Sequence, residues 1–382
     1  MEVQVSEPWV AEPLRGNVRM TAIGGGVLLV PDLGTSYRSD DAGHTWMGAP
    51  EAGPVCPRRD GTVVSLIRHR VPGTRRGRLE PEGDPPWRRF HLDLGVSTDG
   101  WRTVERMPTV IETPPITPTA SDAGSIDNPP GIGNVLELED GRLVASIDGN
   151  FASDSGEMPG LREEFGFPGF RPYRVFLVAS DDGGRTWNFA ASIAHDGVTG
   201  QESFCEEALA DLGNGELLAA MRTGRYAPLH FARSLDGGRS WGAPTAARVL
   251  SLKPGLTLLP NGVLLCAYGW RPYKSNQIYK AALADYHKRY EEAIGIAVPE
   301  GGEAGNYVMA SRDGGQTWQA HIKIAEPVTT GYSSIVAIGH DRALAAVRRC
   351  PWPDEDTSSD WTTGDHVELR EITVAVPATT ER

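Results

Sequence analysis

A glutamate, an arginine and a tyrosine stand at matching positions of short repeated segments, and together they could perform proton transfer and nucleophilic attack. Glu206 and Arg222 lie at equal sequence distances on either side of Asn214, so an antiparallel hairpin would bring them face to face. Tyr332 occupies the position of Glu206 in a later segment of the same kind. A tyrosine is a poor nucleophile at neutral pH because its phenol pKa is about 10. An adjacent carboxylate that accepts the phenol proton would let the oxygen attack an electrophilic carbon.

The repeated segments are hairpins, each with a turn residue followed by apolar residues. Six are found, at Gly24–Val30, Arg59–Leu66, Glu139–Ser146, Gly213–Ala220, Pro260–Ala267 and Gly339–Val347. Laid over one another at the turn, they place Leu33, Arg68, Asp148, Arg222, Gly269 and Arg348 at one matching position after it. The matching position before it holds Asn17, Ala52, Ile132, Glu206, Lys253 and Tyr332. We expect these positions to meet at the open ends of the hairpins, around one axis.

Three arginines at one repeat position favour an anionic ligand. A guanidinium group binds a carboxylate through two parallel hydrogen bonds and keeps its charge at any physiological pH. The alternative is that each arginine forms a structural ion pair with a neighbouring acid. We favour ligand binding because the same position repeats. Lys253, between Glu206 and Tyr332 in the series, would contact the ligand, lower the pKa of Tyr332 or remain a solvated charge.

An eight-residue phrase indicates which elements position these residues. It reads SDDAGHTW from Ser39, SDDGGRTW from Ser180, SLDGGRSW from Ser234 and SRDGGQTW from Ser311, with a degenerate copy STDGWRTV from Ser97. The pattern suits a tight turn, in which Asp accepts backbone hydrogen bonds, Gly adopts positive φ and Trp packs behind. Its repetition predicts one supersecondary unit used several times around a shared core.

This phrase is the Asp-box, and the chain resembles the sialidase superfamily over nearly its whole length. The resemblance implies an all-β fold: a six-bladed β-propeller of four-stranded antiparallel blades, forming a single domain over 1–382. The Asp-box turns would lie on the face opposite the charged ring.

Four long insertions begin just after the second strand of a predicted hairpin, on the face that carries the ring. They are Val71–His91, Gly149–Tyr173, Pro272–Asn306 and Cys350–Asp365. The third contains one predicted short helix, Lys280–Gly295, with apolar residues at helical spacing. Loops of this length are usually functional, so we expect them to wall a binding pocket.

The resemblance also implies roles for individual residues. Glu202–Arg225 resembles the family strand pair in which Glu206 would be the base and Arg222 one arginine of a carboxylate-binding triad. Thr329–Ile338 is similar to the segment that carries the nucleophile, Tyr332, and Pro129–Ser146 resembles the third blade. The loop Val30–Arg38, where the family has its acid, offers only Asp32.

Three departures from the family pattern affect the remaining roles. Leu14–Gly26 lacks the Arg-Ile-Pro phrase and offers only Arg15 or Arg19, and Gly301–Ser311 lacks the usual arginine. Arg68, Arg348 or Arg271 would complete the triad in their place. Asp148 is the alternative to Asp32 as the acid.

These residues predict an exo-acting glycoside hydrolase of the sialidase type that removes a terminal acidic sugar. Glu206 would deprotonate Tyr332 for attack, which gives a retaining mechanism. Two alternatives remain: a propeller acting on another acidic glycan of the uronic-acid type by hydrolysis or elimination, and a non-catalytic propeller that binds a glycan or protein.

Composition and charge limit the partners, cellular location and cofactors that we expect. The chain has 382 residues and a net charge of −13, which argues against nucleic acid and anionic membranes as partners. No apolar run is long enough to cross a membrane, and the start shows no secretory signal, so we expect a cytoplasmic protein, or a secreted one if the N-terminus was trimmed. The four cysteines, Cys56, Cys205, Cys266 and Cys350, lack metal-ligand spacing and are expected to be buried. We expect no cofactor and no metal.

Overall fold

A computed structural model describes most of the chain. The described residues are 1–12, 14–31, 35–69, 79–117, 130–154, 172–197, 199–200, 202–224, 228–270, 305–326, 329–349 and 366–376. Within these ranges the protein is all-β and contains no helix. The predicted helix at Lys280–Gly295 lies outside them, as do most of the predicted insertions Gly149–Tyr173 and Pro272–Asn306 and all of Cys350–Asp365.

The strands follow the chain in short antiparallel runs. The first half comprises β1 (Glu2–Val5), β2 (Trp9–Val10), β3 (Val18–Ile23), β4 (Gly26–Pro31), β5 (Ser36–Ser39), β6 (Met47–Ala49), β7 (Val55–Pro57), β8 (Val63–Ile67), β9 (Glu80–Pro81), β10 (Trp87–Ser97), β11 (Glu105–Thr117), β12 (Gly131–Glu137) and β13 (Leu143–Phe151). The second half comprises β14 (Arg174–Ser180), β15 (Thr186–Ala194), β16 (Cys205–Gly213), β17 (Glu216–Arg222), β18 (Pro228–Ser234), β19 (Thr245–Leu250), β20 (Gly255–Leu258), β21 (Leu264–Trp270), β22 (Gly305–Ser311), β23 (Gln319–Ala325), β24 (Thr329–Ala337), β25 (Arg342–Arg349) and β26 (His366–Ala375).

All six predicted hairpins are confirmed as antiparallel strand pairs: β3–β4, β7–β8, β12–β13, β16–β17, β20–β21 and β24–β25. Three sheets have four strands each, in the orders β3-β4-β5-β6, β16-β17-β18-β19 and β20-β21-β22-β23. A nine-stranded sheet combines two such units, β7-β8-β10-β11 and β12-β13-β14-β15, through a parallel pairing of β11 with β15. In each of these units the strands follow the order of the chain.

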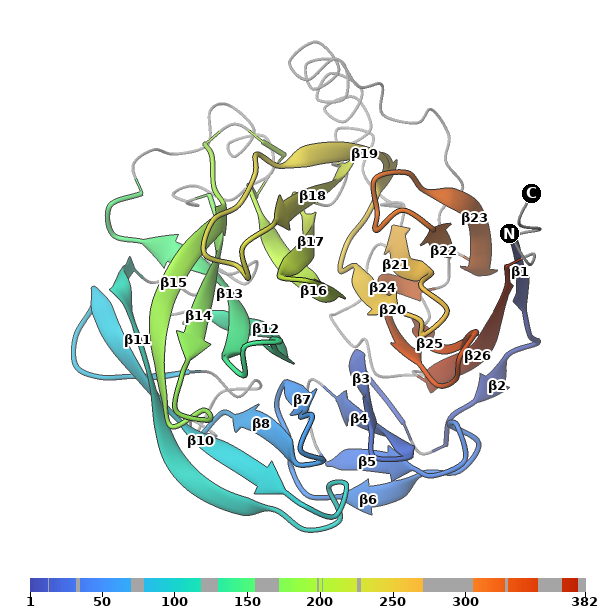
Figure 1. Ribbon diagram of the computed structural model, residues 1–382, viewed down its shortest axis with the longest axis horizontal. Helices are drawn as coiled ribbons and strands as arrows, with labels where there is room; N and C mark the ends of the chain where they lie inside the picture. The colour runs from blue at the N-terminus through green and yellow to red at the C-terminus, as the bar shows by residue number, and fades with distance from the viewer. Residues whose placement is uncertain are drawn as a thin grey trace, which may run out of the picture.

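The first strands of the hairpins lie nearest the centre, and the other strands lie outside them (Figure 1). Each inner strand contacts the inner strand of the next unit, in the order β3, β7, β12, β16, β20, β24 and back to β3. The open ends of hairpins far apart in sequence are therefore close in space.

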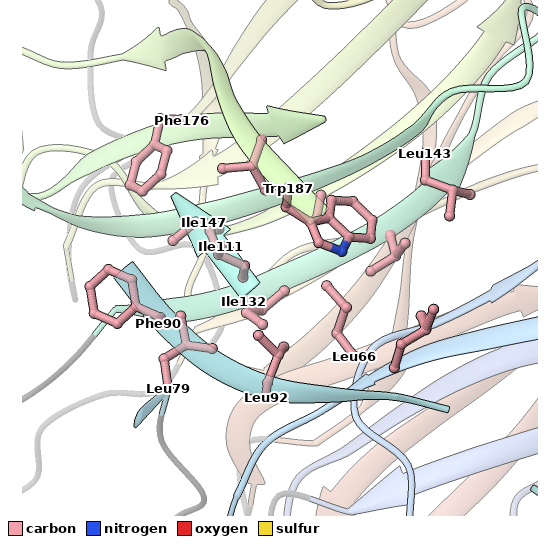
Figure 2. Close-up of a cluster of buried hydrophobic side chains, with 14 of the residues drawn as sticks. Leu66, Leu79, Phe90, Leu92, Ile111, Ile132, Leu143, Ile147, Phe176 and Trp187 are labelled. Atoms are coloured by element: carbon pink, nitrogen blue, oxygen red, sulfur yellow. The ribbon is translucent and has the colours of Figure 1, made fainter. Parts of the chain in front are cut away.

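The apolar core is divided among clusters that lie between neighbouring units. Figure 2 shows one of them, where Leu66 and Leu92 meet Ile132 and Trp187 between β8–β10 and β12–β15. Burial of this surface holds adjacent units together because each sheet presents apolar side chains to its neighbour.

The eight-residue phrases form turns with one hydrogen-bonding scheme. In the second copy the Asp182 carboxylate accepts hydrogen bonds from the backbone N–H and the hydroxyl of Thr186, and the Ser180 hydroxyl donates to the same carboxylate. The other copies, including the degenerate one at Ser97, repeat these bonds. Each turn connects the third and fourth strands of its unit, as expected.

The fifth residue of the phrase seals each turn against the preceding unit. At Gly238, which has a φ of +79°, an added Cβ would lie 2.5 Å from a methyl group of Leu177. The degenerate copy solves the same packing problem differently, because Trp101 stands at this position with a φ of 68° and is fully buried. Its indole N–H donates to the carbonyl of Pro50. The tryptophan has moved from the eighth position to the fifth while the turn is kept.

The last sheet contains both ends of the strand series. Its order is β1-β26-β25-β24, and β2 also pairs with β26. Glu2 pairs with Ala375 and Val5 with Ile372, so the first strand of the chain adds to the last (Figure 1). This outer strand is an addition to the predicted hairpins, none of which includes residues of the N-terminal segment.

One predicted insertion is wrong in part. The segment Val71–His91 was expected to be a loop, but Glu80–Pro81 forms β9 and Trp87 begins β10, and the two strands pair. Strand β10 begins within the predicted insertion because the side chains of Trp87 and Phe90 pack into the cluster of Figure 2. Cys56, Cys205 and Cys266 are buried and unpaired, and Cys350 lies outside the described residues.

Candidate active site

A β-bulge at the open end of the β16–β17 hairpin aims Glu206. Cys205, not Glu206, pairs with Arg222, and the register shifts by one residue between Cys205 and Ala208. Glu206 has a φ of 44°, which a non-glycine residue rarely adopts. The equal-distance prediction for Glu206 and Arg222 is therefore wrong by one residue in the backbone. Bulges commonly re-aim side chains next to functional sites, and this one directs Glu206 towards Tyr332.

Glu206, Tyr332 and Arg222 form one hydrogen-bonded group. The Tyr332 hydroxyl donates to Oε1 of Glu206, and Nη1 of Arg222 donates to Oε2 of Glu206 over 2.7 Å. The same Nη1 lies 3.2 Å from the Tyr332 hydroxyl oxygen. The three side chains come from β16, β24 and β17, so the group depends on the meeting of separate units. Nη2 of Arg222 donates to Glu202 over 3.0 Å.

The charges of this group keep Glu206 ionised. Burial alone would raise the pKa of Glu206, but the Arg222 charge and the hydrogen bonds from Tyr332 and Arg222 outweigh burial and lower it. Burial would lower the pKa of Arg222, but Glu202 and Glu206 hold it well above its ordinary value. Glu206 is thus available as a proton acceptor next to the phenol.

Lys253 adds a second cation beside the tyrosine. Its Nζ lies 5.6 Å from the centre of the Tyr332 ring, within the range of a cation–π contact. Lys253 precedes β20, the inner strand between those that carry Glu206 and Tyr332. A positive charge here would stabilise a phenolate in preference to the neutral phenol.

Asp148 lies at the corresponding end of β13, opposite Gly131. The backbone N–H of Glu206 acts to lower the pKa of this carboxyl. Burial is the largest influence on this group, and together with the charges of Glu207 and Glu206 it raises the pKa of Asp148 to about 7. A carboxyl with this pKa can donate a proton near neutral pH and accept it back.

The other residues predicted for the site are described by the structure only in part. Asp32 and Arg271 lie outside the described residues. Arg68 is half-buried and follows β8, and Arg348 is half-buried in β25 opposite Val367. The backbone register predicted for Asp148 is also wrong by one, because a bulge between Ile132 and Val135 makes Gly131 its partner.

Arg19 is the arginine of the first unit that reaches the cluster. Its guanidinium donates to the carbonyls of Ile132 and Gly133 on β12, while Arg15 is exposed and bonds to Leu14 and Glu12. Of the two arginines predicted as candidates, Arg19 lies within β3 and Arg15 precedes the strand. The role of either one in binding a carboxylate stays a prediction.

Two acidic residues next to Glu206 were not predicted to belong to the site. Glu202 neutralises Arg222, and Glu207 is buried beside Asp148. Both flank Glu206 in the run Glu202–Glu207, so the density of acids was visible in the sequence. The directions of these two side chains depend on the bulge, and no sequence pattern predicted the bulge.

The described side chains support acid–base and nucleophilic chemistry. Among the described residues, no group of three or more His, Cys, Asp or Glu side chains is arranged to hold a metal ion. In the same part of the chain, no helix is long and apolar enough to cross a membrane.

Comparison with solved structures shows that the fold is shared with sialidases. The chain is 16% identical to the Hadza microbial sialidase Hz136, with a TM-score of 0.59, covering 94% of this chain and 66% of that one. It is 9% identical to the intramolecular trans-sialidase of Ruminococcus gnavus, with a TM-score of 0.55, covering 96% of this chain and 95% of that one. A Dyadobacter fermentans protein of unknown function is 17% identical at a TM-score of 0.59, covering 98% and 99%.

These identities establish a likeness of fold. The chain spans about two thirds of the length of the Hadza sialidase. No protein-family model and no curated protein matches the sequence.

Proposed function

We propose that the chain is a six-bladed β-propeller, a single domain over 1–382, and a retaining exo-glycosidase of the sialidase type. The substrate would be a glycan with a terminal acidic sugar. The closed order of contacts among the inner strands supports the blade count. The repeated turns, with their shared Ser–Asp–Thr hydrogen bonds, support the assignment of the Asp-box.

One observation carries the enzymatic proposal: the Tyr332 hydroxyl donates to Glu206 while Arg222 contacts both. In the first step Glu206 accepts the phenol proton and the Tyr332 oxygen forms a bond to the anomeric carbon. The glycosidic C–O bond breaks, and its electron pair and a proton from Asp148 go to the leaving oxygen. In the second step water loses a proton to Asp148 and attacks the same carbon. The Tyr332–sugar bond breaks, and its oxygen recovers a proton from Glu206.

A tyrosine nucleophile suits an anionic sugar because a neutral phenol avoids a carboxylate facing a carboxylate. Lys253 and Arg222 provide positive charge next to Tyr332, which favours both the phenolate and an acidic substrate. Arg68 and Arg348 are the further candidates for binding the sugar carboxylate, and Asp32 is the alternative acid.

The test is release of 4-methylumbelliferone from its sialic-acid glycoside. Tyr332→Phe and Glu206→Gln should each lower turnover by about 10²- to 10⁴-fold. Tyr37→Phe on β5 and Glu216→Gln, at the turn end of the Glu206 hairpin, are the matched controls and should retain activity. When the substrate is an α-glycoside, proton NMR should show that the sugar is first released as the α-anomer. No turnover by folded wild-type protein would contradict the sialidase assignment.

A second candidate keeps the fold and changes the acidic sugar to a uronic acid. It is favoured by the two departures from the family's arginine pattern: Leu14–Gly26 lacks the Arg-Ile-Pro phrase and Gly301–Ser311 lacks an arginine. For either sugar, the substrate carboxylate would have to displace Glu202 from Arg222 or bind elsewhere. A parallel assay with 4-methylumbelliferyl glucuronide distinguishes the two sugars, and the absorbance of an unsaturated product would reveal elimination.

A further inference from the structure

Glu207 is a buried carboxyl that the proposed chemistry does not use. Its exposed fraction is 5%, and its Oε1 has no hydrogen-bond partner. The Ser146 hydroxyl and the positive charges of Arg19 and Lys253 act to lower the pKa of Glu207, but burial outweighs them and raises it. A buried carboxylate with so few partners is costly, so its retention beside the site requires a physical reason.

Glu207 and Asp148 are held against the same strand. An added Cβ at Gly131 would lie 2.5 Å from Oδ1 of Asp148, and one at Gly133 would lie 2.0 Å from Oε1 of Glu207. The backbone of β12 thus approaches both carboxyls as closely as glycine permits. Arg19, reaching from β3, fixes this backbone through the carbonyls of Ile132 and Gly133.

The two carboxyls favour a single shared negative charge. Burial and the neighbouring Glu207 raise the pKa of Asp148 to about 7, and burial also raises the pKa of Glu207. Glu206, which faces Asp148 from the bulge, opposes ionisation further, while Arg19 favours it. When two carboxyls interact this strongly, their protons dissociate in two steps that belong to the pair.

We propose that Asp148 and Glu207 share one proton at neutral pH, and that this pair is the proton donor of the site. Asp148 is half-buried and is the member of the pair that would contact the substrate, whereas Glu207 is buried and would act through Asp148 as a positioning residue. Only the donor role depends on the proposed function; the shared proton does not. On donation, the proton passes from Asp148 to the leaving oxygen as the glycosidic bond breaks, and the pair takes a proton back from the attacking water.

The shared proton is tested without substrate, by infrared difference spectroscopy of the folded protein between pH 5 and about 9. The wild type should show a protonated carboxyl that titrates near pH 7. Asp148→Asn should remove this titration. Glu207→Gln should lower its midpoint by about one pH unit or more, because a negative charge is lost from beside Asp148. Glu216→Gln is the control and should leave it in place.

Ser146→Ala should move the midpoint of the infrared titration in the opposite direction. It also provides a second test if Glu207→Gln does not fold. The Ser146 hydroxyl lowers the pKa of Glu207, so its loss should disfavour ionisation of the pair and raise the midpoint. A midpoint unchanged in both variants would overturn the shared proton, whatever the protein's activity.

The donor role is tested by the pH dependence of kcat/KM on the substrate that the protein cleaves. In Glu207→Gln the alkaline limb should shift to lower pH by the same amount as the infrared midpoint, while turnover on the acid side is retained. Glu207→Asp, which restores the charge, should return the limb towards its wild-type position. An alkaline limb that stays in place while the infrared midpoint moves would overturn the donor role.

Discussion

Arg222 is the residue on which the arrangement of the site depends most directly. It is buried, and it joins three groups from the same end of the hairpins: Glu202, Glu206 and Tyr332. Its side chain fixes the carboxylate of Glu206 so that one oxygen remains for the phenol. Because the guanidinium is planar and presents several N–H donors, it can hold all three partners at once, which a lysine cannot.

Arg222→Met should therefore destabilise the fold as well as the site. It leaves the half-buried carboxylates of Glu202 and Glu206 without their buried cation, and the free energy of unfolding should fall by about 3–5 kcal/mol. Arg89→Met is the matched control, since Arg89 and Glu112 form an ion pair in which each side chain is 49% exposed. That change should cost less than about 1 kcal/mol. Urea unfolding measures both, and equal losses would show that Arg222 has no structural role beyond that of an exposed pair.

At the scale of the element, the repeated turn is the unit that the sequence specifies best. Its serine, aspartate and threonine satisfy one another and the backbone locally, so the phrase forms the same turn in five places. Even the copy with Trp101 in place of glycine keeps the scheme. The carboxylates of these turns are exposed, and hydrogen bonding holds them ionised in acid.

Acid unfolding should reveal the contribution of these turns. For Asp182, slight burial would raise the pKa, but hydrogen bonds from the N–H and hydroxyl of Thr186 outweigh it and lower the pKa to about 2. A depressed folded-state pKa gives stability that is complete above the unfolded value of about 3.9 and lost as pH falls towards 2. Asp182→Asn should flatten this loss, measured as the free energy of unfolding between pH 5 and about 2. The neighbouring Asp181→Asn should retain the wild-type slope, and a common slope for both variants would contradict the role of Asp182.

Hairpins and turns were predictable because their signals are local, whereas the directions of site residues were not. Counting from Asn214 pairs Glu206 with Arg222, yet the bulge shifts the pairing of Arg222 to Cys205. The bulge is not encoded by glycine or proline at Glu206 itself, so propensity gives no warning of it. Arg19 and Glu207 acquire their roles only when β3 and β16 meet β12 across the centre.

At the scale of the whole molecule, the site exists only if the ring of inner strands is held closed, because Glu206 and Tyr332 come from different units. The last unit takes its outer strand, β1, from the start of the chain, and Val3 and Val5 of that strand pack on the cluster shared by β21–β23 and β24–β26. Gln4, between them, faces the other side and is exposed. Thus β1 ties the first residues of the chain to the unit that carries Tyr332.

The double substitution Val3→Asp and Val5→Asp should weaken this closure. Two charges would have to enter an apolar cluster or β1 would have to leave β26, so the free energy of unfolding should fall by about 2–4 kcal/mol. Gln4→Asp changes the same strand on its exposed side and should cost less than about 0.5 kcal/mol. Urea unfolding gives the stabilities, and hydrogen exchange of β26 amides shows whether β1 separates locally, since its backbone N–H groups would lose their partners. If the double variant is as stable as Gln4→Asp and β26 stays protected, the ring must be closed by the contacts of β24 with β3 and β20, without help from β1.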